Sequence, residues 1–170
     1  MKQTGWQKSW VRILTTLLTA AVMIMIFTFS TEDAEHSDRT SGLISRQVLS
    51  IIHPEYEQLA ETEQKKLYDD IQHAVRKCAH FTEYALLGLM IRLCLESWFG
   101  HRVKKSSSLS LAGLCMGILY ACSDEFHQLM IEGRSGQWTD VAVDGSGALL
   151  GILIGTVLIK CVQRKYTDME

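Results

Sequence analysis

The sequence predicts an all-α fold: a polytopic membrane helix bundle of four transmembrane helices, with an amphipathic helical extracytoplasmic segment between the first and the second. Three observations support it. Apolar residues gather in four long continuous runs, charged residues concentrate between positions 31 and 79, and basic residues flank the runs in a consistent pattern. The 170 residues are 47% hydrophobic and include a single proline. We expect residues 1–170 to form one membrane domain.

The predicted spans cover about residues 13–30, 81–98, 109–128 and 141–162. Each approaches the roughly 20 apolar residues that a helix needs to cross a bilayer. The first run is followed by the acidic stretch TEDAE and carries no small-x-small cleavage site, so we expect a retained helix rather than a signal peptide. Helices are favoured over barrel strands because the runs are continuous and do not alternate.

Basic residues predict the orientation. They occur before the first run, between the second and third, and at the end of the fourth: Lys2, Lys8, Arg12, His101, Arg102, Lys104, Lys105, Lys160, Arg164 and Lys165. If four helices alternate, all three groups fall on one side, which the positive-inside rule makes cytoplasmic. Both termini are then cytoplasmic, and the segments 31–79 and 130–139 face outward.

The outer segment 31–79 contains helical patterns of its own. Apolar residues at helical spacing predict a short amphipathic helix that ends before Pro54: Leu43, Ile44, Val48, Ile51 and Ile52. A second helix, about 62–77, runs into the second span. The first of these helices either lies on the outer leaflet with its apolar stripe in the interface, or packs as a cap over the bundle.

Glycines recur at four-residue spacing in the fourth run, at Gly147, Gly151 and Gly155. A helix face without side chains lets a neighbouring helix approach closely. We expect these glycines to mediate packing within the chain or a homodimer.

Ionisable and polar residues form three clusters at the outer borders of the last three runs. The clusters are His80, Glu83 and Tyr84; Asp124, Glu125, His127, Gln128 and Arg134; and Asp140 and Asp144. Charged groups this close to hydrocarbon cost a few kcal/mol each, so they are functional candidates. Two interpretations remain open. The residues either lock three helix ends together or line a pocket that opens to the outer face.

In the pocket interpretation, we assign catalytic roles to His80, Glu83, Asp124 and Asp140, because imidazole and carboxylates exchange protons. We assign ligand binding to Tyr84, Glu125, His127, Gln128, Arg134 and Asp144, with Arg134 suited to grip an anionic head group. No metal site is assigned, because HxxE and DExH lack an established ligand spacing, and the sequence leaves the cofactor unknown. The sequence contains no basic stripe with interleaved aromatic residues, so it gives no sign of nucleic-acid binding.

These residues resemble the VanZ-like family of small bacterial membrane proteins, named for a teicoplanin-resistance protein. The matching motifs are Lys77-x-x-His80-Phe81-x-x-Tyr84-x-x-Leu87-Gly88, Ser123-Asp124-Glu125-x-x-Gln128, and Gly133-Arg134 followed by Asp140-x-x-x-Asp144-x-x-Gly147-x-x-x-Gly151. The resemblance covers about residues 75–155 and implies a multi-pass protein of the bacterial cell membrane.

Two functions are consistent with this resemblance. In the first, the outward pocket engages a lipid-linked cell-wall precursor or a lipoglycopeptide, and the protein contributes to teicoplanin-type resistance or to cell-envelope function. In the second, the chain is an intramembrane hydrolase or transferase that acts on a lipid head group or a lipid-linked cell-wall precursor. The sequence alone does not decide whether the protein is an enzyme.

Overall fold

The computed structural model describes residues 8–31, 34–103, 105–131 and 138–167, and within these ranges it contains helices and no strand. The elements in chain order are α1 (Ser9–Ser30), α2 (Ala34–Ile52), the short 3-10 helix η2 (Tyr56–Gln58), α3 (Glu61–Phe99), α4 (Ser106–Gln128) and α5 (Trp138–Thr167). α1, α3, α4 and α5 are long and apolar enough to cross a membrane. The all-α bundle with four candidate spans is therefore confirmed.

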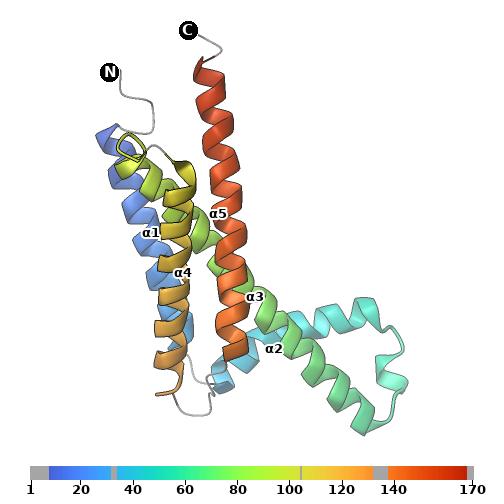
Figure 1. Ribbon diagram of the computed structural model, residues 1–170. Helices are drawn as coiled ribbons and strands as arrows, with labels where there is room; N and C mark the ends of the chain where they lie inside the picture. The colour runs from blue at the N-terminus through green and yellow to red at the C-terminus, as the bar shows by residue number, and fades with distance from the viewer. Residues whose placement is uncertain (1–7, 32–33, 104, 132–137, 168–170) are drawn as a thin grey trace.

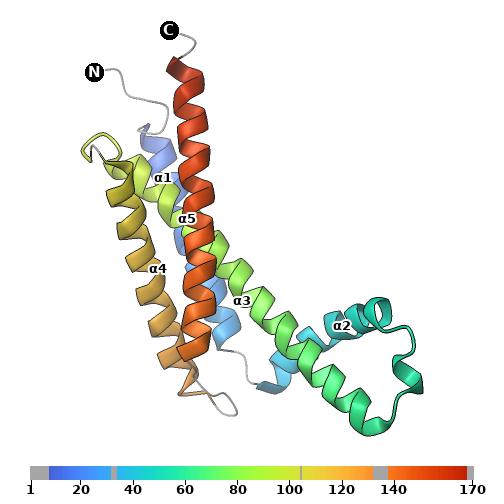
Figure 2. The ribbon, with the colours of Figure 1, turned by 45° about the vertical axis from the view of Figure 1, so that its right-hand side comes forward.

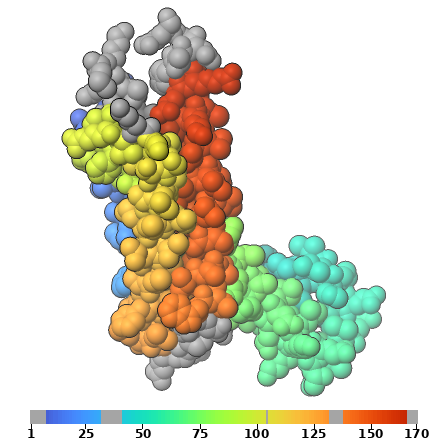
Figure 3. Space-filling model, viewed as in Figure 1, coloured from blue at the N-terminus to red at the C-terminus, as the bar shows by residue number. Residues whose placement is uncertain are grey.

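The four long helices run alternately up and down (Figure 1). α3 and α5 share the most extensive interface, and α4 and α1 pack against this pair. The outer faces of the bundle are apolar: Leu17, Ile24, Leu119 and Val157 each expose 59% or more of their surface. Figure 3 shows how the surfaces of α4 and α5 form one side of this column. Apolar surface on this scale requires an apolar surrounding, as a lipid bilayer provides.

α3 is a single helix of 39 residues. At 1.5 Å per residue it is about 58 Å long, roughly twice the hydrocarbon thickness of a bilayer. Its first half therefore extends beyond the bundle, where α2 packs against it (Figures 1 and 2). The predicted helix over 62–77 is thus continuous with the second span.

α2 ends at Ile52, directly before the segment that contains Pro54, as the sequence predicts. It begins at Ala34, well before the first apolar residue of the predicted helix. From residue 41 onward, where the side chains of α2 are described, the buried residues are Ser41, Gly42, Ser45 and Leu49, so this part of the buried face is mostly small and polar. Nε2 of Gln72 on α3 donates a hydrogen bond to Oγ of Ser41 over 3.3 Å.

The predicted apolar stripe of α2 stays exposed. Leu43, Ile44, Ile51 and Ile52 are 71%, 50%, 78% and 57% exposed, and Val48 is partly buried. This face is not covered by the bundle, so the cap interpretation does not account for these apolar residues. Such a stripe is typical of a helix that lies in a membrane interface.

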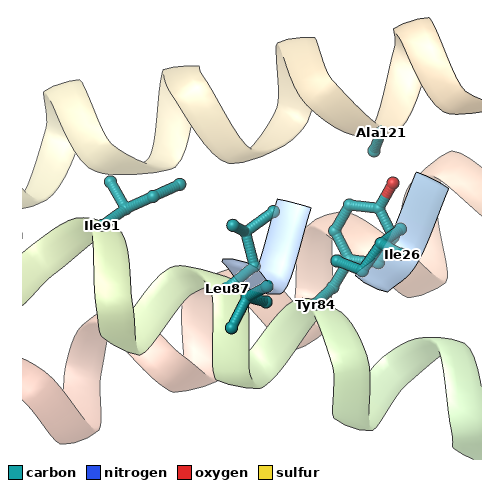
Figure 4. Packing of buried hydrophobic residues seen from close by; sticks show 6 residues of the cluster. Ile26, Tyr84, Leu87, Ile91 and Ala121 are labelled. Carbon is teal, nitrogen blue, oxygen red and sulfur yellow. The ribbon is translucent and has the colours of Figure 1, made fainter. Parts of the chain in front are cut away.

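The bundle core is built from three helices. Tyr84, Leu87 and Ile91 of α3 follow one another at helical spacing and meet Ile26 of α1 and Ala121 of α4 (Figure 4). Tyr84 and Leu87 are completely buried. Figure 4 shows the Tyr84 hydroxyl pointing towards α4, so one polar group lies inside an otherwise apolar cluster.

The glycines of α5 lie against α3. A Cβ atom on Gly147 would meet the carbonyl oxygen of Phe81, and one on Gly151 would overlap the carbonyl oxygen of Ala85. Gly88 on α3 makes the same kind of approach to Ala148. Of the two roles predicted for this face, packing within the chain is the one seen here. A homodimer through the same glycines would have to displace α3.

A buried polar network joins α3, α4 and α5 near the end of the bundle where α4 begins. The sequence analysis did not single out its residues. Arg92 is fully buried and donates to Oε2 of Glu96 at 3.0 Å, to Ser106 at 2.7 Å and to Thr156 at 3.2 Å. Gln163 donates to Oε1 of Glu96 at 3.0 Å. Every nitrogen of the guanidinium has a partner, so we assign this network to helix–helix locking.

Candidate functional site

The three predicted polar clusters come from three different helices: the middle of α3, the C-terminal end of α4 and the N-terminal turns of α5. These segments lie at the end of the bundle opposite to Ser9 and to the C-terminal end of α5 (Figures 1 and 2). The chain reverses between α4 and α5, so the last turn of one helix faces the first turns of the next. The topology therefore places the clusters at one depth.

Three side chains converge in this region. One ring nitrogen of His80 and one carboxylate oxygen each from Asp124 and Asp144 lie within 4.8 Å of one another. Nδ1 of His80 is 3.8 Å from Oδ1 of Asp144. Each helix contributes one member, so the contact depends on the packing of the bundle. We refer to these three residues as the His–Asp–Asp cluster.

The two carboxylates of the cluster are buried. Asp144 has no exposed surface and Asp124 is only 4% exposed, whereas the side chain of His80 keeps 32% of its surface exposed. Neither oxygen of Asp144 has a hydrogen-bond partner among the described residues, and the same holds for Oδ1 of Asp124. Oδ2 of Asp124 accepts a hydrogen bond from Nε2 of Gln128 at 3.2 Å. An unsatisfied buried acceptor costs about 1–3 kcal/mol, so the fold is destabilised at this point.

Further acidic and phenolic groups surround the cluster. Glu83 and Glu125 both interact electrostatically with Asp144, and Glu125 is buried. The hydroxyl of the fully buried Tyr84 lies within the electrostatic range of Asp124 and Asp144. The site therefore holds several acids close to one imidazole, which is an arrangement suited to proton transfer or to cation binding.

Asp140 lies outside the cluster. Its Oδ1 forms an ion pair with Nζ of Lys77 on α3, and both side chains are partly exposed. Oγ1 of Thr139 donates to the same oxygen at 3.2 Å. Asp140, predicted as catalytic, thus has a cationic partner in this structure, while Asp144, predicted as a binding residue, belongs to the cluster. Lys77 is the residue that our site prediction missed, although it lies one helical turn before His80.

The remaining predicted residues take separate positions. His127 stacks on Phe27 of α1, with ring centroids 4.8 Å apart and an interplanar angle of 27°. Gln128 is buried beside Asp124. Arg134, the predicted anion-binding residue, lies outside the described residues. His80, Glu83, Tyr84, Asp124, Glu125, Gln128 and Asp144 are thus the predicted residues that gather around the site.

A pocket of about 750 Å³ lies elsewhere, between α2 and the first turns of α3. Its lining includes Arg46, Leu49, Tyr56, Lys65 and Tyr68. This pocket belongs to the hairpin that α2 and the first half of α3 form beyond the bundle, and not to the His–Asp–Asp cluster. We therefore base the candidate site on the geometry of the cluster.

Comparison with known proteins agrees with the motifs. Residues 15–159 match the VanZ/LLP1 family, a range that includes most of α1, the hairpin and the whole His–Asp–Asp cluster. Comparison with curated proteins and with solved structures gave no match. Because the family match covers most of the sequence, this chain belongs to the VanZ/LLP1 family.

Proposed function

We propose that this chain is a cell-envelope enzyme that acts on the polar head group of a membrane amphiphile, as a hydrolase or transferase. The observation that carries the proposal is the convergence of His80, Asp124 and Asp144 from three helices. Locking three helices needs satisfied polar contacts, as the Arg92 network has. The cluster instead keeps buried carboxylate oxygens without partners, which destabilises the fold and is typical of functional sites.

The orientation proposed here follows from the basic residues. Arg12, Lys105 and Arg164 lie at the end of the bundle that is remote from the cluster. Under the positive-inside rule that end is cytoplasmic. The His–Asp–Asp cluster then lies towards the outer face of the membrane, where head groups of the outer leaflet and lipid-linked cell-wall precursors are within reach.

The chemistry assigned to the site is acid–base catalysis. His80 retains exposed surface, so a water molecule or an acceptor hydroxyl can reach its imidazole. The imidazole accepts the proton of this nucleophile, whose oxygen attacks the head group. The carboxyl group of Asp144 gives a proton to the departing oxygen, and the proton on His80 then restores that carboxyl group. Acid–base assistance of this kind contributes about 10²–10⁴-fold to a rate.

The reaction is tested with the purified full chain in lipid vesicles that contain a lipid-linked cell-wall precursor. We expect release or transfer of the head group, measured by mass spectrometry of the lipid and water-soluble fractions. His80→Ala, Asp124→Asn and Asp144→Asn should abolish the product. A product yield that these three substitutions leave unchanged would show that the cluster is not catalytic.

A second function is favoured by the exposed stripe of α2. Leu43, Ile44 and Ile51 present apolar surface beside the proposed outer border of the membrane. A lipoglycopeptide carries a lipid anchor, so binding there would support a role in teicoplanin-type resistance without a reaction. In a resistance assay this function predicts that deletion of residues 41–53 removes protection, whereas Asp144→Asn retains it at equal membrane level.

A further inference from the structure

We propose that His80, Asp124 and Asp144 bind a divalent transition-metal cation, with Zn²⁺ and Mn²⁺ as the best-suited ions. The inference rests on the proposed function for the location of the site and for the class of substrate. When the ion is bound, these three residues would act as ligands in place of the acid–base roles given above, because donor atoms that coordinate a metal cannot also accept or release the proton. Metal binding is measured without turnover, so the two proposals can fail independently.

The donor atoms meet the geometric requirement. Tetrahedral ligands at about 2.1 Å from a metal lie roughly 3.4 Å from one another. The three donor groups lie within 4.8 Å of one another, and the His80–Asp144 pair is already at 3.8 Å. Side-chain rotations that move each donor by less than about 1 Å would bring them to ligand distance. No rearrangement of the helices is needed.

The buried oxygens of Asp144 provide an independent observation. This side chain is completely buried, and neither of its oxygens accepts a hydrogen bond within the described part of the chain. Oδ1 of Asp124 is also buried and accepts no hydrogen bond from the described residues, and Asp124 belongs to the same group of donors. Carboxylate oxygens of this kind are expected to be paired or to coordinate a metal when they are buried. A bound cation would supply the missing partner to both residues at once.

The charge balance points in the same direction. Asp124, Glu125 and Glu83 are the acids whose charges act on Asp144. Lys77 also acts on Asp144, but its ammonium group forms an ion pair with Asp140. Acidic groups thus outnumber basic groups around the cluster in the described structure. A charge of +2 between the three donors would offset this excess, and in a site of low dielectric constant the offset is strong.

The ligand set limits the choice of metal. One imidazole and two carboxylates suit zinc, manganese and iron, whereas magnesium and calcium favour oxygen ligands alone. Three protein ligands leave at least one position for water or substrate, as in catalytic rather than structural zinc sites. The ion would polarise a phosphoryl or carbonyl oxygen of the head group. It would also let an anionic substrate approach two carboxylates that otherwise repel it.

The experiment uses the full chain, purified in detergent, stripped with a chelator and then titrated with Zn²⁺ or Mn²⁺. We expect one equivalent of metal per chain by mass spectrometry of the eluted protein, and Mn²⁺ that loses its free-ion electron paramagnetic resonance signal. Asp144→Asn and His80→Ala should weaken binding by more than about tenfold, because each removes a ligand. Asp140→Asn is the matched control, since it removes a carboxylate one helical turn away that already pairs with Lys77, and it should bind normally.

A second variant keeps the test decisive if loss of a carboxylate disturbs folding. Asp124→Cys replaces a carboxylate by a thiolate, and with Co²⁺ it should give a sulfur-to-cobalt charge-transfer band that the original chain and a Ser123→Cys variant lack. The proposal is overturned if the folded chain binds no stoichiometric metal, or if Asp144→Asn and Asp140→Asn bind equally. Metal binding without any head-group reaction would overturn the proposed function alone, and a head-group reaction by a folded chain that binds no metal would overturn the metal site alone.

Discussion

Nδ1 of His80 on α3 lies 3.8 Å from Oδ1 of Asp144 on α5. The distance is too long for a hydrogen bond, so the two groups interact electrostatically and leave the carboxylate without a donor. On the same two helices, Arg92 donates to Thr156 at 3.2 Å. The α3–α5 pair therefore carries a satisfied polar contact near one end and an unsatisfied one near the other. We therefore expect opposite effects on stability when a buried carboxylate is replaced by an amide at each end.

Asp144→Asn should leave the chain as stable as before, or more stable by up to about 2 kcal/mol, when metal is removed by a chelator. The substitution replaces a fully buried carboxylate that has no hydrogen-bond partner among the described residues by a neutral amide. Thermal unfolding in detergent measures the change, and the activity assay should show loss of function. A variant that unfolds at much lower temperature would assign Asp144 to structure.

Glu96→Gln makes the same chemical change at the other end and should destabilise the chain by about 3 kcal/mol. Glu96 accepts hydrogen bonds from the fully buried Arg92 and from Gln163, so the amide leaves a buried guanidinium without its counter-charge. The unfolding measurement used for Asp144→Asn applies directly. Equal effects of the two substitutions would contradict the distinction between a locking network and a functional site.

The helices could be predicted from the sequence because apolar runs of membrane length have few alternatives. The predicted span 109–128 ends at the last residue of α4, and the predicted end of the first span matches the end of α1. The continuity of α3 was also predicted, since the helix expected over 62–77 runs into the second span, whereas the early start of α2 was not predicted. The residues between Ala34 and Gly42 are mostly polar and carry no apolar stripe, so their pattern does not mark the beginning of α2.

The sequence could predict the region of the candidate site but not which side chains meet there. The sequence placed all three clusters at one border, and most of their residues do gather there. It could not show that Asp144 rather than Asp140 joins His80 and Asp124, since one helical turn separates the two acids. It also gave no metal signature, because the donors come from three helices and local spacing cannot record a contact made by tertiary packing.

Gly151→Ala should destabilise the bundle by about 1–3 kcal/mol through overpacking. The added methyl group would overlap the carbonyl oxygen of Ala85, which is a backbone atom that cannot move aside independently. Gly145→Ala on the same helix is the matched control. Its Cβ would lie 3.5 Å from Cγ1 of Ile118, an ordinary contact, so this variant should match or exceed the stability of the original chain. If both variants were tolerated equally, the close α3–α5 packing would be wrong.

The ion pair of Lys77 and Asp140 should contribute little to stability. Both side chains are partly exposed, at 25% and 31%, so a double-mutant cycle with Lys77→Met and Asp140→Asn should give a coupling of less than about 1 kcal/mol. Unfolding of the two single variants and the double variant measures it. A coupling of several kcal/mol would place the pair in a far drier environment than its exposure indicates.

Tryptophan placed on the apolar stripe of α2 should report contact with the membrane interface. Ile51 is 78% exposed, so Ile51→Trp should fold normally and, in vesicles, should be quenched by lipids brominated near the head group. Ser50→Trp is the matched control, because residue 50 is exposed on another face of α2 and lines the hairpin pocket. Quenching is compared with that of the original chain, whose four tryptophans give the background. Stronger quenching at position 51 than at 50 is expected if α2 lies in the interface, and quenching at position 51 that does not exceed the background would show that the stripe faces water or another protein.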